Sequence, residues 1–489
     1  MITSRRNFLA GSALALGATY LHANEIPAPP PYGALPNARQ QRWQRMETYG
    51  FLHFGVNTFT DKEWGAGDEN PDIFHPTDFD PDQIVTSMKA GGMQGVILTC
   101  KHHDGFCLWP TKTTKHSIAY SSWRNGKGDI VRDISEAARR HGLKFGIYVS
   151  PWDRNNAAYA TPAYLPIYRE QITELLSNYG PVFEVWFDGA NGGTGYYGGA
   201  RERRHIDAHI YYEWPRTYAI VRRLQPEAVI HGGDTDADIR WVGDEKGIAG
   251  NPCWATFSPD NSVDGGNTHQ LMTGTLHGTH WMPAECDVSI RPGWFWHASQ
   301  NSKVKSPKEI LDLYYQSVGR GASLLLNVPP NTKGQLSPED VASLKGFHEL
   351  VESTFSDNLA RHARLSGSNV RGNERRYAPA NLLNGSPYSY WATDNTATTP
   401  DLKLEFPSPV TFDVIRLREY TELGQRIEDF AIEARVNGTW TQIATDASVG
   451  ISRLIRLDKP VTTQWVRLRI VESPVPIALS EFGLYAGPA

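Results

Sequence analysis

An acidic side chain closes one of the apolar runs of this sequence. Val182–Phe187 is apolar apart from Glu184, and Asp188 follows it directly, close to Trp186. A carboxylate at the end of a buried strand faces the edge of a sheet, where it can attack an electrophilic carbon or accept a proton. The alternative interpretation of Asp188 is a helix N-cap in the loop after the strand.

Polar side chains also close three other apolar runs. They are His53 and Asn57 after the first run, Lys101-His102-His103-Asp104 after the second, and Tyr148, Ser150 and Trp152-Asp153 after the third. Each has a structural explanation when taken singly, since a lone His or an Asp before Gly is common in turns. Their recurrence at the ends of different strands indicates one shared site.

One reaction that begins with attack by a carboxylate is hydrolysis of a glycosidic bond, and that reaction would need a second carboxyl group. One carboxylate attacks the anomeric carbon, while the other carboxyl protonates the leaving oxygen and later activates water. Spacing alone leaves six candidates for this second group: Glu63, Asp236, Asp244, Glu245, Glu285 and Asp287. Glu245 follows a Gly-flanked polar loop after a strand, which suits a group that must reach over a substrate.

Alternating strands and helices from about 40 to 355 must position these residues. The expected strands are Phe51–Gly55, Gly95–Lys101, Lys144–Ser150, Val182–Asp188, Ala228–Gly232 and Ser323–Val328. The expected helices are Pro81–Ala90, Asp129–His141, Pro162–Tyr179, Tyr212–Leu224, Lys308–Gly319 and Pro338–Glu352. This alternation indicates a parallel sheet, and its length favours an α/β fold of the (β/α)₈ (TIM) barrel type, residues 40–355. One or two barrel strands within 240–300 stay unassigned.

The pattern changes after residue 355. Short alternating runs replace the helical period, as in Leu402–Phe406, Val414–Leu417 and Phe430–Ala434, with turn residues such as Asn437-Gly438 between later runs. Residues 356–489 are therefore expected to form an antiparallel β-sandwich.

The first residues have the pattern of a targeting segment. Arg5-Arg6 precede a mild apolar run that ends near Ala23, which is typical of a twin-arginine signal peptide over residues 1–23, with a Sec signal as the alternative. A Pro-rich lead-in follows over 24–39. The protein is therefore expected to be exported, to the periplasm or outside the cell, with no membrane association after signal removal.

Composition narrows the function classes. The 489 residues carry a formal charge of −5 without a basic stripe, which argues against nucleic acid as a partner. The 15 Trp and 21 Tyr suit stacking on sugars, although a large core also uses them. The four cysteines show no disulfide framework or zinc spacing and are expected to be buried, with one disulfide left open.

The barrel region resembles glycoside hydrolase family 29, the retaining α-L-fucosidases. The matching segments are His53-Phe54-Gly55, Glu63-Trp64-Gly65, Lys101–Phe106, Gly146-Ile147-Tyr148, Trp186–Gly189 and Arg240–Glu245. The resemblance implies a fucosylated glycan as substrate and no metal or other cofactor. It implies Asp188 as nucleophile, with fucose held by His53, Glu63, Trp64, His102, His103, Tyr148, Trp186 and Trp294.

Two further stretches refine this resemblance. Arg240–Glu245 and Ser289–Phe295 are similar to the branch restricted to α-1,3- and α-1,4-linked fucose, which implies Glu245 as acid/base. Asp244 departs from the Asn expected before this Glu. A like charge there either raises the pKa of Glu245 or has no effect on it. The C-terminal region resembles a discoidin-type (coagulation factor type C) sandwich, expected to be a structural cap rather than a glycan-binding module.

Two rival functions stay open at this point. A metal-dependent hydrolase would use His53, His102, His103 and Asp188 as ligands, although adjacent histidines point to opposite faces of a strand unless the strand has already ended. A non-enzymatic carbohydrate-binding protein would rely on the sandwich and would not need paired carboxyl groups.

Overall fold

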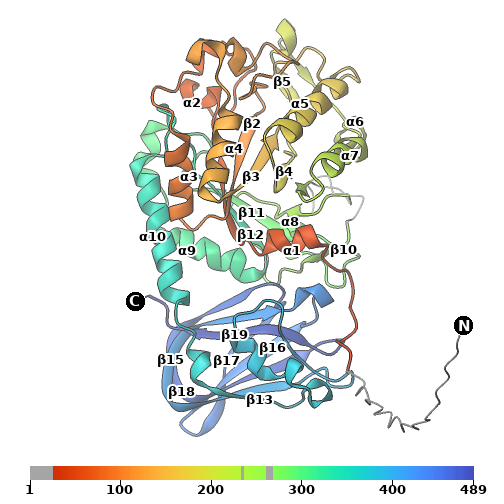
Figure 1. The fold of residues 1–489 in the computed structure, drawn as a ribbon, viewed down its shortest axis with the longest axis vertical. Helices are drawn as coiled ribbons and strands as arrows, with labels where there is room; N and C mark the ends of the chain where they lie inside the picture. Colours follow the sequence, from red (N-terminus) through yellow and green to blue (C-terminus); the bar gives the residue numbers. More distant parts are fainter. Residues whose placement is uncertain (1–25, 233–235, 260–267, 489) are drawn as a thin grey trace, which may run out of the picture.

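The computed structural model describes residues 26–232, 236–259 and 268–488, and the expected signal peptide lies outside them. The chain forms a barrel surrounded by helices and, beside it, a domain made almost entirely of strands (Figure 1). No helix in the described part of the chain is long and apolar enough to cross a membrane.

Eight parallel strands build the barrel. They are β1 Thr48–Leu52, β2 Gly95–Lys101, β3 Lys144–Val149, β4 Glu184–Trp186, β7 Val229–His231, β8 Arg240–Trp241, β11 Ala284–Ser289 and β12 Ser323–Asn327. Their order is β7-β4-β3-β2-β1-β12-β11-β8, and a parallel bridge between His231 and Ile239 joins the two ends. The predicted (β/α)₈-type barrel is confirmed, with the sheet nearly closed.

Helices cover the outside of this sheet. The α-helices are α1 Ala38–Gln44, α2 Val56–Thr60, α3 Pro81–Ala90, α4 Ile130–His141, α5 Tyr164–Asn178, α6 Ala208–Tyr211, α7 Trp214–Leu224, α8 Thr268–Thr273, α9 Pro307–Gln316 and α10 Pro338–Phe355. Local sequence sets several boundaries: α4 begins after Asp129, whose carboxylate accepts the Arg132 N–H, and ends at Gly142, which has φ +75°. Ser306 and Glu309 form a capping box on α9.

The unassigned region contributes β8 and β11 to the barrel, together with the short pair β9 Thr256–Phe257 and β10 His280–Trp281. The apolar pattern of the sequence did not predict β11, because Glu285 and Asp287 occupy alternate positions on this strand. β8 is only two residues long, and the buried guanidinium of Arg240 secures it to the carbonyls of Leu271 and Trp254. Long-range contacts of this kind leave no periodic signal in the sequence.

Several strand boundaries differ from the sequence expectation, and two of the differences bear on the site. β1 ends at Leu52 rather than Gly55, because α2 begins at Val56 after a short turn. β4 ends at Trp186, so Asp188 lies in the loop after the strand. A second two-stranded sheet, β5 Gly193–Gly195 and β6 Glu202–Arg204, extends that loop.

The C-terminal domain is an antiparallel sheet structure with its own core, as predicted. Its strands are β13 Arg364–Gly367, β14 Trp391–Ala392, β15 Asp401–Glu419, β16 Asp429–Val436, β17 Thr439–Ala447, β18 Arg453–Glu472 and β19 Ala478–Tyr485. The separate runs expected at 402–406 and 414–417 belong to one long strand, β15, whose pairing with β18 is irregular between them. Trp391 is fully buried in this core.

Polar contacts join this domain to the barrel. Arg418 of β15 pairs with Glu47, which also accepts a hydrogen bond of 2.9 Å from Tyr314 of α9. The described part of the Pro-rich lead-in, from residue 26 on, lies against the same domain, where the Tyr32 N–H donates to the Leu423 carbonyl (Figure 1). Cys100, Cys107, Cys253 and Cys286 are all buried free thiols.

Candidate active site

A cavity of about 520 Å³ opens at the carboxyl ends of the barrel strands. Its lining includes Trp186, Asp188, His231, Trp241, Glu245 and Asp287, together with an aromatic side formed by Tyr212, Trp214, Tyr218 and Phe257. Asp188 and Glu245, which follow different strands, thus face the same space. A volume of this size accommodates a sugar and part of what is attached to it.

Asp188 is held by donors on both carboxylate oxygens. Tyr148 donates its hydroxyl to Oδ2 at 2.7 Å, and the Ala190 N–H donates to Oδ1 at 2.6 Å. The side chain stays 21% exposed and lies 3.8 Å from His103 Nε2. The Ala190 contact is a local turn, but no helix begins there, so the N-cap interpretation does not account for Asp188.

Trp186 forms the floor of the cavity beside Asp188. Its indole ring stacks on the ring of His231, with centroids 4.1 Å apart and an interplanar angle of 11°, and on Tyr148. The indole N–H donates 2.6 Å to Glu285, a fully buried carboxylate that also accepts the hydroxyl of Tyr49. Glu285 therefore fixes the floor from below.

Three histidines lie next to this floor, all from strand ends. β2 ends at Lys101, so His102 and His103 lie beyond the strand, and their ring centroids are 4.1 Å apart. The expected obstacle of opposite strand faces therefore does not apply. His53 Nδ1 donates 2.9 Å to Asn327 Oδ1 at the end of β12.

These histidines are buried in their neutral form. Burial lowers the pKa of His53 to about 3 and holds the pKa values of His102 and His103 below the usual range. Ser150 donates its hydroxyl to the Trp152 carbonyl and so accepts from His103 Nδ1 at 2.7 Å. His103 Nε2 is thereby left as an acceptor for a hydroxyl group, and the same holds for His53.

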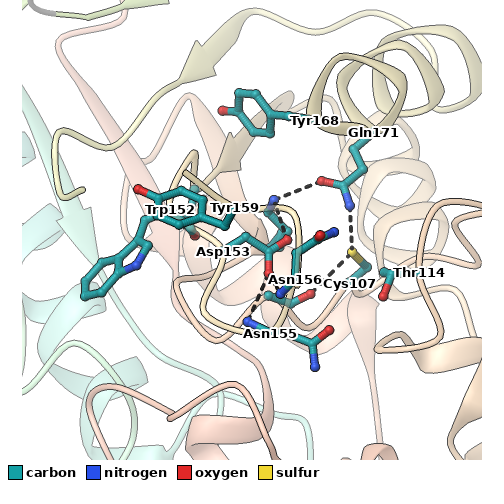
Figure 2. Close-up of polar contacts among 12 residues, drawn as sticks. Cys107, Thr114, Trp152, Asp153, Asn155, Asn156, Tyr159, Tyr168 and Gln171 are labelled. Carbon is teal, nitrogen blue, oxygen red and sulfur yellow. Dashed lines mark hydrogen bonds and ion pairs between the residues drawn. The ribbon is translucent and has the colours of Figure 1, made fainter. Parts of the chain in front are cut away.

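A buried ion pair anchors the loops that carry these rings. The Lys101 ammonium, fully buried at the end of β2, lies 3.5 Å from Asp153 Oδ2 and donates 2.9 Å to both Tyr164 and Gln171. Asp153 in turn accepts the backbone N–H groups of Asn155 and Asn156. Figure 2 shows this network, with Asp153 at its centre and Gln171 reaching Cys107.

Trp64 lies beside the histidines. Its ring lies edge-on to His103 at 5.1 Å and to Trp152 at 5.5 Å, yet the residue is 52% exposed. An exposed aromatic face beside buried histidines is the arrangement that a sugar ring can cover.

Glu245 belongs to the opposite side of the site. Trp294 donates its indole N–H to Glu245 Oε2 at 3.1 Å, and its ring lies 5.0 Å from that of His53. The Trp294 backbone N–H donates 2.8 Å to Glu63 Oε2. Asp244 accepts the Lys246 N–H at 3.0 Å, so its carboxylate is engaged in its own turn.

The remaining carboxyl candidates fall in different places. Glu285 is fully buried against Trp186. Asp236 lines a separate depression, together with Asn37 and His280. Asp287 does line the active-site cavity, where it accepts the indole N–H of Trp241 at 2.8 Å. Burial, followed by the charge of Glu285, raises the pKa of Asp287 well above its usual range.

The sequence interpretation missed several residues of this site. His231 and Asn327 follow the same strand-end pattern that pointed to Asp188, and that pattern could have found them. Trp241 and Asp287 lie on strands that the sequence left unassigned. Among the described residues, no group of three or more His, Cys, Asp or Glu side chains could hold a metal ion.

Comparisons with known proteins match both parts of the chain. A family model for α-L-fucosidase matches residues 33–353, and a model for the F5/8 type C domain matches residues 365–482. Alpha-L-fucosidase 1 of Arabidopsis thaliana is 42% identical over 464 residues, covering 94% of this chain and 89% of the relative.

Solved structures agree with this match. A glycoside hydrolase 29 family member from an unknown rumen bacterium is 40% identical with a TM-score of 0.84, covering 94% of this chain and 78% of that one. A glycoside hydrolase 29 fucosidase of Ruminococcus gnavus, solved in complex with fucose, is 31% identical with a TM-score of 0.86, covering 94% and 97%.

Proposed function

The chain belongs to the α-L-fucosidases of glycoside hydrolase family 29, and from this premise we propose that it releases terminal L-fucose with retention of configuration. One observation carries the proposal: Asp188 and Glu245 line the same sugar-sized cavity. The fucosidase activity of the family requires two such carboxyl groups with different tasks.

In the first step Asp188 is the nucleophile. Its carboxylate attacks the anomeric carbon while Glu245 gives its proton to the glycosidic oxygen, so the aglycone leaves as an alcohol and a fucosyl ester forms on Asp188. The donors Tyr148 and Ala190 fix the orientation of the attacking carboxylate. Positive charge that builds on the sugar ring is stabilised by this anion.

In the second step Glu245 acts as a base. It takes a proton from water, the resulting hydroxide attacks the anomeric carbon, and the ester bond to Asp188 breaks. Two inversions give the net retention. His53 and His103 accept hydrogen bonds from fucose hydroxyl groups, and His102 lies beside them against the sugar. Trp186 and Trp64 contact the apolar face of the sugar, and Glu63 and Trp294 complete the pocket.

The proposed substrates are α-1,3- and α-1,4-linked fucose on branched oligosaccharides or N-glycans. The Arg240–Glu245 and Ser289–Phe295 stretches support this proposal, because they resemble the branch with that restriction. The part of the active-site cavity lined by Tyr212 and Trp214 also supports it, because it leaves room for an acceptor. The aromatic residues Tyr212 and Trp214 on that side of the cavity give a branched acceptor a surface to stack on.

Leaving-group dependence tests the two roles. Glu245→Ala should spare aryl fucosides with good leaving groups far more than natural glycans, because only the latter need a proton. Asp188→Ala should abolish turnover with an unchanged fold, and azide should restore fucose transfer and give β-fucosyl azide. Equal losses on both substrate types would exclude Glu245 as the acid.

Linkage is tested with a panel of α-1,2-, α-1,3-, α-1,4- and α-1,6-fucosides. Release of fucose from only the α-1,3 and α-1,4 members is expected, whereas efficient cleavage of the α-1,2 or α-1,6 members would overturn the proposed restriction.

We further propose that the protein is exported and that the sandwich is a structural cap. The Arg418–Glu47 contact and the burial of Trp391 support the cap. Fractionation of expressing cells tests export, and glycan-array binding by the full chain with Asp188→Ala tests the cap. Array signals that survive when the cavity is blocked by fucose would contradict it.

A further inference from the structure

His297 joins two carboxylates that belong to the loop after α2. Its Nδ1 lies 2.6 Å from Asp61 Oδ1, and its Nε2 lies 2.6 Å from Glu63 Oε1. Ionised carboxylates only accept hydrogen bonds, so both ring nitrogens must carry a proton. Asp61, Glu63 and His297, here called the His297 clamp, therefore contain an imidazolium between two anions.

The clamp continues towards the cavity through Trp294. The second oxygen of Glu63 accepts the Trp294 backbone N–H at 2.8 Å, and the indole N–H of Trp294 donates 3.1 Å to Glu245. Gly293 makes room for this contact, because a Cβ there would lie 2.2 Å from Glu63 Oε1. A chain of four short contacts thus runs from Asp61 to Glu245.

We propose that His297 is a positioning residue, which in its protonated form holds Glu63 in its sugar-facing place and keeps the Trp294 indole on Glu245. This inference rests on the proposed function, since it assigns Glu63 to the sugar and Glu245 to the proton transfer. His297 itself contacts neither of the reacting carboxyl groups.

The charges around His297 support a protonated ring. Burial lowers its pKa, but the hydrogen bonds to Asp61 and Glu63 and their charges outweigh burial, so the pKa is raised above 6.5. Arg291 also contacts His297: its guanidinium donates to the His297 carbonyl and pairs with Asp340. The clamp is complete below the raised pKa and is lost as the pH rises through it.

The pH dependence of kcat/KM tests the clamp. An aryl α-L-fucoside with a good leaving group, such as 2-chloro-4-nitrophenyl α-L-fucoside, removes the need for a protonated Glu245, so that any remaining basic limb reports the clamp. Asp61→Asn keeps an acceptor for Nδ1 but removes one charge, and its side chain is 78% exposed, so the fold should tolerate it. His297→Gln removes the titrating ring.

The wild type should show a basic limb with this substrate, and Asp61→Asn should move that limb to lower pH. His297→Gln should abolish the limb and lower kcat/KM about tenfold at pH 6, the loss of one charge-assisted hydrogen bond. His141→Gln is the matched control, because His141 pairs with Asp82 at 2.7 Å between α3 and α4. It should leave the profile unchanged.

An unmoved limb in both Asp61→Asn and His297→Gln would overturn the inference. A merely structural role for His297 would lower activity in His297→Gln while leaving the limb of Asp61→Asn where it is in the wild type. If the wild type released no aglycone from the aryl fucoside, the proposed function itself would fail, and the two failures are therefore distinguishable.

Discussion

Lys101→Met should destabilise the barrel severely, because it leaves Asp153 as a buried charge without its cation. The two side chains are 0% and 2% exposed, and their charged atoms lie 3.5 Å apart. Removing one partner of a buried ion pair costs about 3–5 kcal/mol, whereas replacing both partners by neutral groups is often close to neutral. The loss should appear as a lower urea midpoint, followed by Trp fluorescence.

The double variant separates charge from packing. Asp153→Asn keeps an oxygen that accepts the N–H groups of Asn155 and Asn156. The double variant Lys101→Met with Asp153→Asn should therefore lose less free energy of unfolding than the two single variants lose together, by at least about 2 kcal/mol. Lys345→Met is the control, since Lys345 forms an exposed pair with Glu349 and should be close to neutral.

A loss of less than about 1 kcal/mol in Lys101→Met, or strict additivity in the double variant, would refute this reasoning. Activity adds a second readout, because His102 follows Lys101 directly and Trp152 precedes Asp153. Lys101→Met that still folds should show a raised KM for aryl fucosides, since the loops that carry the sugar wall would no longer be fixed.

Three substitutions and one treatment extend these tests. Tyr148→Phe removes a 2.7 Å donor from Asp188 and should lower kcat/KM about ten- to hundredfold, the worth of a hydrogen bond to a charged group, without changing the melting temperature much. Gly293→Ala should displace Glu63 and lower kcat/KM at least about tenfold, with an unchanged circular dichroism spectrum. Burial lowers the pKa of His116 to about 4, so the unfolded chain takes up a proton on His116 at higher pH than the folded chain does. The free energy of unfolding of the wild type therefore falls as the pH drops from 6.5 towards 4. His116→Phe should lack this contribution, so its free energy of unfolding should fall by about 2–3 kcal/mol less than that of the wild type by pH 4. Prolonged EDTA treatment should leave fucose release unchanged, whereas lasting inactivation would favour a metal-dependent hydrolase.

The barrel could be predicted because most of its strands are apolar runs separated by amphipathic helices. The same logic found Asp188 at the carboxyl end of β4, although the strand stops at Trp186 and Asp188 lies two residues beyond it. It failed for β8 and β11, since two residues secured by Arg240 carry no period and Glu285 with Asp287 interrupt an apolar pattern. Both failures lie next to the cavity, where polar groups replace core residues for chemical reasons.

Spacing alone could not identify the second carboxyl group. It left six candidates open, the polar loop before Glu245 made that residue a suitable one, and the family resemblance then assigned it the acid/base role. The structure narrows these candidates: Glu285 is fully buried and Asp236 lines a separate depression, whereas Glu245 and Asp287 both line the active-site cavity. His297 and Glu63 are 234 positions apart, and their contact depends on how the strand order brings the loops after β1 and β11 together.

Trapping of the fucosyl-enzyme tests the two-carboxyl mechanism most directly. With 2-deoxy-2-fluoro-α-L-fucosyl fluoride, the fluorine at C2 slows both steps while the fluoride leaving group speeds the first, so the covalent intermediate should accumulate. Peptide mass spectrometry should then find the sugar on Asp188. A label on another carboxyl group such as Asp287, or no label together with β-L-fucose as the first product, would contradict the account.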